Sequence, residues 1–109
     1  MKFRSKSSSE ETSKTDLPQR IQDGALLIDA RSPMEFSGGH IDGAINLPHD
    51  IIGQEIKTHA AAKNRSMVVY CQSGGRSQMA VKTLHDAGYT QVENGGAIDL
   101  LRQQIGTSS

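Results

Sequence analysis

The residues with the clearest chemical potential in this sequence form the segment Cys71-Gln72-Ser73-Gly74-Gly75-Arg76-Ser77. Cys71 is the only cysteine of the chain and directly follows the apolar run Met67–Tyr70. Two adjacent glycines allow a tight turn in which successive backbone N–H groups converge on one point. A helix after such a turn adds the positive end of its dipole, so the pattern favours a thiolate at Cys71 and a lowered pKa.

Arg76 is the only charged side chain of this segment, and we expect it to provide the positive charge of the site. The alternative interpretation is that Cys71 is a small buried hydrophobe at a strand end, as free cysteines often are. The glycines, the arginine and the strand–loop–helix setting favour a reactive thiol over that interpretation.

Short apolar runs that alternate with helical stretches must position this segment. The predicted strands are Ala25–Ile28 (ending at Asp29), Ala44–Leu47, Met67–Tyr70 and Gln91–Glu93. The predicted helices are Ser32–Glu35, which opens with a capping-box pattern, Asp50–His59, Ser77–Ala87 and Ile98–Ile105. This alternation predicts an α/β fold with a small open, mainly parallel β-sheet flanked by helices. Sites in such sheets form at the carboxyl ends of the strands, which is where Cys71 lies.

The chain has 109 residues, of which 35% are hydrophobic, against about 45–50% in an average globular chain. The deficit is concentrated at the start, where Met1 and Phe3 are the only apolar residues before Leu17. We therefore expect residues 1–16 to be a disordered leader, residues 17–105 to form one domain, and residues 106–109 to be a loose tail.

The composition also excludes several kinds of function. Twelve basic residues balance twelve acidic ones, so no nucleic-acid partner is expected. No apolar run approaches the roughly 20 residues that span a bilayer, so no membrane span is expected. The histidines indicate no metal site and no cofactor is expected; His49, His59 and His85 are interpreted as surface residues. A free thiol and the lack of an export signal favour the cytoplasm, or the periplasm if a signal has been removed.

Four motifs in order resemble those of the rhodanese-like sulfurtransferases, with the phage-shock-protein E type among the minimal members. They are Leu27-Ile28-Asp29-Ala30-Arg31-Ser32-Pro33-Met34-Glu35-Phe36, Gly39-His40-Ile41-Asp42-Gly43-Ala44-Ile45-Asn46-Leu47-Pro48, Val69-Tyr70-Cys71-Gln72-Ser73-Gly74-Gly75-Arg76-Ser77, and Gly88-Tyr89 through Glu93-Asn94-Gly95-Gly96. Together they span residues 26–101 approximately.

The resemblance implies a thiosulfate sulfurtransferase. Cys71 would accept a sulfane sulfur from a donor such as thiosulfate and pass the sulfur of its persulfide to cyanide, a thiol or a protein acceptor. The backbone N–H groups of Gln72, Ser73, Gly74, Gly75, Arg76 and Ser77 would stabilise the thiolate and then the terminal sulfur. Asp29 and Arg31 would act structurally near the loop, or would form no more than an exposed ion pair. His40 would make a structural hydrogen bond in a turn.

Two departures from the family pattern affect these expectations. Gln72 and Ser73 are neutral where related loops often carry basic residues, which predicts weak use of anionic thiosulfate. The portion before Leu26 is also short, so we expect the first strand of a full module to be missing.

Two other functions remain open. The cysteine phosphatases and arsenate reductases on related scaffolds have five residues between cysteine and arginine, whereas four separate Cys71 from Arg76 here. The smaller loop suits a sulfur atom better than a phosphate group. The other possibility is a sulfur-carrier or partner-binding module with little turnover, which would use the same persulfide.

Overall fold

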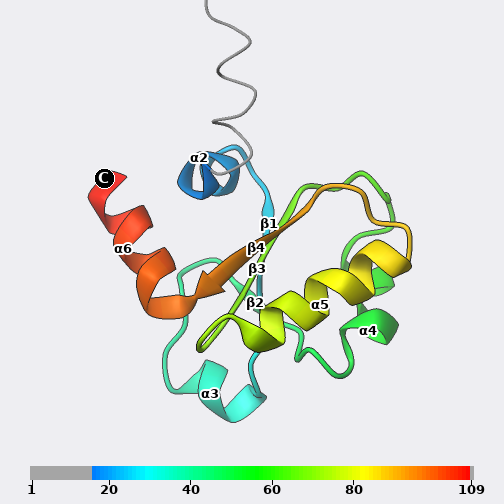
Figure 1. Cartoon of the computed structure of the whole chain (residues 1–109), viewed down its shortest axis with the longest axis horizontal. Helices are drawn as coiled ribbons and strands as arrows, with labels where there is room; N and C mark the ends of the chain where they lie inside the picture. The colour runs from blue at the N-terminus through cyan, green and yellow to red at the C-terminus, as the bar shows by residue number, and fades with distance from the viewer. Residues whose placement is uncertain (1–15, 109) are drawn as a thin grey trace, which may run out of the picture.

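The structure, a computed structural model, describes residues 16–108 (Figure 1). In chain order its elements are α2 (Leu17–Gln22), β1 (Leu26–Asp29), α3 (Pro33–Ser37), β2 (Ile45–Asn46), α4 (Ile52–His59), β3 (Met67–Cys71), α5 (Gly75–Asp86), β4 (Val92–Ala97) and α6 (Ile98–Ser108). Within these residues, none of the helices is long and apolar enough to cross a membrane.

The four strands form one sheet in the order β2-β1-β3-β4, and every pair is parallel. Each residue of β3 is buried, as expected for a central strand that is covered on both faces. The parallel α/β sheet predicted from the sequence is therefore confirmed. Asp29 and Cys71 end β1 and β3, so both lie at the carboxyl edge of the sheet.

Helices cover both faces of this sheet, with α4 and α5 on one side and α2 and α6 on the other (Figure 1). The side chains of β1 and β3 alternate between the two faces, as the period of a strand requires. Under α4 and α5 the buried residues include Ile28, Val69, Ile52, Ile56 and Leu84. Under α2 and α6 they include Leu27, Val68, Leu17, Ile98 and Leu101.

β4 contains one residue more than the part of β3 that it pairs with. Val69 pairs with Asn94, but the next residue, Tyr70, pairs with Gly96. The extra residue is Gly95, which is buried; a Cβ atom there would lie 3.2 Å from the backbone oxygen of Val69. This bulge therefore needs glycine because a side chain has no room against the central strand.

Several element boundaries differ from those predicted. α4 begins at Ile52 instead of Asp50, and α5 begins at Gly75 instead of Ser77. β4 extends to Ala97 although Asn, Gly and Ala have low strand propensity, because pairing with β3 outweighs that propensity. α6 passes Ile105 and includes residues 106–108 of the predicted tail, since a single glycine weakens a helix by only about 1 kcal/mol.

The start of the described chain is a short helix. The predicted disordered leader, residues 1–16, lies outside the described residues except for Asp16, whose carboxylate accepts a hydrogen bond from Gln19 N at 3.2 Å and so caps α2. Within residues 16–108, no strand precedes β1.

Candidate active site

The Cys71–Ser77 segment joins the carboxyl end of β3 to the start of α5. Gly74 is the N-cap of α5 and has a φ of +104°, a backbone conformation that residues with a side chain rarely adopt. This turn brings the first backbone N–H groups of α5 back toward Cys71, as the two adjacent glycines predicted.

The Cys71 side chain is buried, with an exposed fraction of 0%, and polar groups of the loop surround its sulfur. The N–H groups of Gly74 and Ser77 donate hydrogen bonds to Sγ at 3.0 and 3.2 Å. The Ser77 hydroxyl oxygen lies 3.5 Å from Sγ. Burial alone would fit a cysteine that only fills space in the core, but such a role needs no donors directed at sulfur. The geometry therefore favours a stabilised thiolate.

Burial and hydrogen bonding act in opposite directions on this thiol. Burial has the largest single effect and raises the pKa of Cys71, because a charged sulfur is poorly solvated there. The hydrogen bonds with the Ser77 side chain and the backbone groups of Ser77, Gly74 and Ser73 together outweigh it, and the net pKa lies below the usual value of 9.0. The hydrogen bonds around Sγ therefore shift the pKa of Cys71 in the direction predicted from the sequence.

Replacing Ser77 by alanine is expected to raise the pKa of Cys71, because it removes the side-chain hydrogen bond that contributes most to lowering it. The rate of alkylation by iodoacetamide follows the thiolate fraction, so its midpoint against pH should move upward in Ser77→Ala. The matched substitution Ser37→Ala, at an exposed position on α3, should leave that midpoint unchanged. An unshifted midpoint in Ser77→Ala would show that backbone amides alone set the pKa.

Asn94 of β4 holds Ser77 in place, a contact that the sequence did not predict. Its side-chain oxygen lies 2.7 Å from Ser77 Oγ and accepts a hydrogen bond from Gly96 N at 2.8 Å. The Ser77 hydroxyl also lies 3.0 Å from the backbone oxygen of Gly74. Since a hydroxyl has a single proton, these acceptors and the Cys71 sulfur compete for it, and the competition decides whether Ser77 donates to the thiolate.

Asp29 and Arg31 form a buried ion pair behind the loop. Arg31 Nη2 lies 2.8 Å from Asp29 Oδ2, and the two side chains are only 6% and 0% exposed. Of the two interpretations left open by the sequence, the exposed ion pair is therefore wrong, because the loop covers the end of the strand. Arg31 also donates to Gln72 Oε1 at 3.1 Å and to the backbone oxygen of Gly39 at 2.7 Å, so it connects β1 to the Cys71 loop.

Arg76 is not a free cation at the surface of the loop. Its Nη1 and Nη2 atoms donate to the two carboxylate oxygens of Glu35 at 2.8 and 3.0 Å. Glu35 is held in turn by the predicted capping box, in which it accepts from Ser32 N and Ser32 Oγ. The hydrogen bond with Arg76, followed by that with the Ser32 backbone, lowers the pKa of Glu35 to about 2. The sequence indicated Glu35 only as a helix-capping residue.

His40 lies in the segment that follows α3, directly after Gly39. Its Nδ1 atom is 2.8 Å from the backbone oxygen of Phe36, and its ring stacks on the Phe36 ring with a centroid distance of 3.7 Å. These contacts are those of a structural histidine, the role expected from the sequence.

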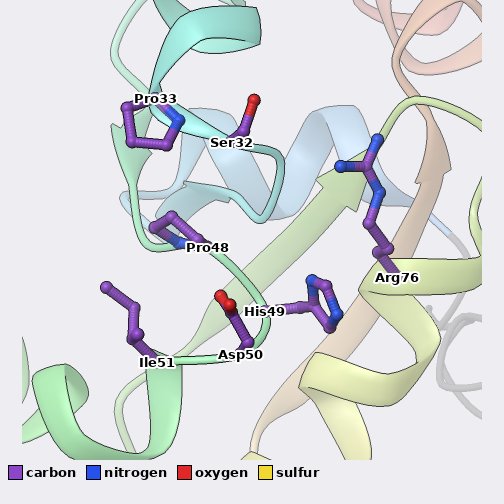
Figure 2. Close-up of a pocket in the computed structure, with 7 residues that line it drawn as sticks. All are labelled: Ser32, Pro33, Pro48, His49, Asp50, Ile51 and Arg76. Atoms are coloured by element: carbon purple, nitrogen blue, oxygen red, sulfur yellow. The ribbon is translucent and has the colours of Figure 1, made fainter.

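A cavity of about 340 Å³ borders Arg76, and we call it the Arg76 cavity. Figure 2 shows Arg76 on one side of it and Pro33 on the other. The lining residues are Ser32, Pro33, Pro48, His49, Asp50, Ile51 and Arg76. His49 was interpreted as a surface residue but is half-buried and lines this cavity, whereas His59 and His85 are exposed. Among residues 16–108, no cluster of His, Cys, Asp and Glu could hold a metal ion.

Comparison with known proteins agrees with this geometry. The model of the rhodanese-like domain family matches residues 13–95, which is more than half of the chain. The thiosulfate sulfurtransferase PspE of Escherichia coli is 39% identical over 71 residues, covering 65% of this chain and 68% of that protein. A sulfurtransferase of Allochromatium vinosum is 39% identical over 93 residues, covering 82% and 85%.

Solved structures show the same relationship. A rhodanese with anions from Escherichia coli superposes with a TM-score of 0.67 at 37% identity, covering 70% of this chain and 89% of that one. The human single-domain sulfurtransferase TSTD1 gives a TM-score of 0.68 at 26% identity, covering 81% and 91%. The loop, the parallel sheet and the sequence match agree, and the chain belongs to the rhodanese-like family of sulfurtransferases.

Proposed function

We propose that this protein transfers a sulfane sulfur from a donor such as thiosulfate to a thiophilic acceptor through a persulfide on Cys71. The observation that carries the proposal is the set of donors around the Cys71 sulfur, which lowers the pKa of a thiol that burial alone would keep protonated. A thiolate is the nucleophile that attack on a sulfane sulfur requires.

Two displacements complete the proposed cycle. The Cys71 thiolate attacks the outer sulfur of thiosulfate, the S–S bond breaks, and sulfite leaves with the electron pair. Cyanide or a thiolate then attacks the terminal sulfur of the persulfide, which releases thiocyanate or a new persulfide and restores the Cys71 thiolate. The backbone N–H groups of the loop, from Gln72 to Ser77, stabilise the negative sulfur in both steps.

The remaining predicted site residues have supporting roles in this proposal. The Asp29–Arg31 pair fixes the loop through Gln72, and His40 orders the turn beside Gly39. No cofactor takes part. We propose the cytoplasm as the compartment, with the periplasm as the alternative, because reducing conditions keep such a thiol free.

Intact-mass measurement after incubation with thiosulfate tests the proposal. We expect a gain of one sulfur atom that cyanide removes with release of thiocyanate, and no gain in protein previously alkylated with iodoacetamide. A persulfide that forms but does not turn over with cyanide or small thiols would indicate the sulfur-carrier role instead. An unchanged mass with thiosulfate and with organic persulfides would reject both. Phosphate-ester hydrolysis in the same preparation would support the phosphatase alternative.

A further inference from the structure

The charge at the Cys71 loop depends on one contact between distant parts of the chain. Arg76 is the loop's only charged side chain, and both terminal nitrogens of its guanidinium bind the carboxylate of Glu35. Each side chain is 35% exposed, so the pair is accessible from solvent. Such a two-point contact fixes the orientation of the guanidinium and occupies donors that an anion would otherwise use.

The geometry of α3 holds Glu35 in this position. One carboxylate oxygen accepts from Ser32 N at 3.0 Å and from Ser32 Oγ at 3.1 Å, while it also accepts from Arg76. The capping box therefore anchors the carboxylate independently of Arg76. The low pKa of Glu35, about 2, means that the side chain is ionised at every pH at which a thiolate could exist.

The surroundings of the pair do not restore a positive charge. The Arg76 cavity contains one further carboxylate, that of exposed Asp50, and apolar surface from Pro33, Pro48 and Ile51. The guanidinium of Arg76 thus has two carboxylates near it, those of Glu35 and Asp50. The charged side chains around this cavity therefore provide no net attraction for a dianion such as thiosulfate.

We propose that Glu35 is a specificity-determining residue. By neutralising Arg76, it lowers the rate at which Cys71 reacts with dianionic donors relative to the rate with uncharged donors. This inference rests on the proposed function for its substrate class. Its charge test does not require sulfur transfer, because any electrophile that reacts with Cys71 experiences the same field.

The test compares Glu35→Gln with the unaltered protein at pH 8. Glutamine retains the acceptor of the capping box but carries no charge. For charges about 8 Å apart in water, Coulomb's law predicts that removing one negative charge raises the rate of persulfide formation from dianionic thiosulfate about five- to tenfold. For monoanionic iodoacetate the expected increase is about two- to threefold, since the Coulomb energy halves with the ligand charge. Uncharged iodoacetamide provides the reference rate.

Asp86→Asn is the matched control, because it removes the same charge at the opposite end of α5. Two results would overturn the proposal. In the first, the rates with thiosulfate and iodoacetate, each divided by the rate with iodoacetamide, do not change in Glu35→Gln. In the second, these rate ratios rise equally in Asp86→Asn. If iodoacetate selectivity rises but no persulfide forms in any variant, the charge role of Glu35 stands and the proposed function fails.

Ionic strength provides a second measurement if Glu35→Gln does not fold. Added salt accelerates the encounter of like charges and slows that of opposite charges, because it screens both. If the region around Arg76 lacks net positive charge, added salt should not slow the reaction of the unaltered protein with iodoacetate. The rate with iodoacetate, divided by the rate with iodoacetamide, should therefore stay constant or rise with salt. A clear fall would mean that Arg76 acts as an unneutralised cation and would overturn the proposal.

Discussion

Replacing Cys71 by serine is expected to reduce sulfur transfer by about three orders of magnitude or more, to the rate of the uncatalysed reaction. A serine hydroxyl stays protonated at neutral pH, whereas the loop stabilises a thiolate. The measurement is thiocyanate release from thiosulfate and cyanide, with intact mass as the direct readout of the persulfide. Substantial turnover in Cys71→Ser would mean that another group carries the sulfur.

Cys71→Ala gives a control for the hydrogen-bonding part of this argument. Serine keeps an acceptor for the N–H groups of half-buried Gly74 and buried Ser77, but alanine leaves both N–H groups without their sulfur partner. Each unsatisfied buried donor costs about 1–3 kcal/mol, so we expect Cys71→Ala to unfold at a lower urea concentration than Cys71→Ser. Equal midpoints would contradict the role of sulfur as an acceptor.

Asp29→Ala is expected to lower the free energy of unfolding by about 3–5 kcal/mol, because it leaves the buried guanidinium of Arg31 without its counter-charge. The carboxylate accepts from both the side chain and the backbone N–H of Arg31, so these donors lose their partner as well. Activity should fall with stability, since Arg31 also holds Gln72. Urea unfolding measures the stability directly.

The exposed pair between Lys82 and Asp86 is the matched control for this experiment. Its side chains are 77% and 67% exposed, so Asp86→Ala should change stability by no more than about 1 kcal/mol. A double variant, Asp29→Ala with Arg31→Met, should recover part of the loss because no uncompensated charge remains. If Asp29→Ala costs no more than Asp86→Ala, the buried pair has no structural importance.

The features that the sequence predicted correctly depend on local signals. The capping box at Ser32 and Glu35 is four residues long, and the apolar runs that become β1 and β3 are continuous in sequence. The Cys71 loop was predicted for the same reason, because its glycines and the following helix are adjacent. Such signals locate the cysteine and its backbone cradle without knowledge of the rest of the fold.

The features that the sequence did not predict are contacts between distant segments. Glu35 and Arg76 are 41 positions apart, and Ser77 and Asn94 are 17 apart. Residue types alone do not show that these side chains meet, since that depends on the strand order and on the bulge at Gly95. The sequence also did not predict the burial of the Asp29–Arg31 pair, because the loop that covers this pair follows a different strand, β3.

The hydrogen-bonding groups around Cys71 are completed late in the synthesis of this chain. Parallel neighbours in a sheet are joined by long crossovers, so the segments that support the loop come from well-separated parts of the chain. Asn94, which holds Ser77, belongs to the last strand to be made. A nascent or truncated chain that ends before β4 therefore carries Cys71 without this support. The position of Ser77 beside the Cys71 sulfur is therefore complete only when β4 has joined the sheet.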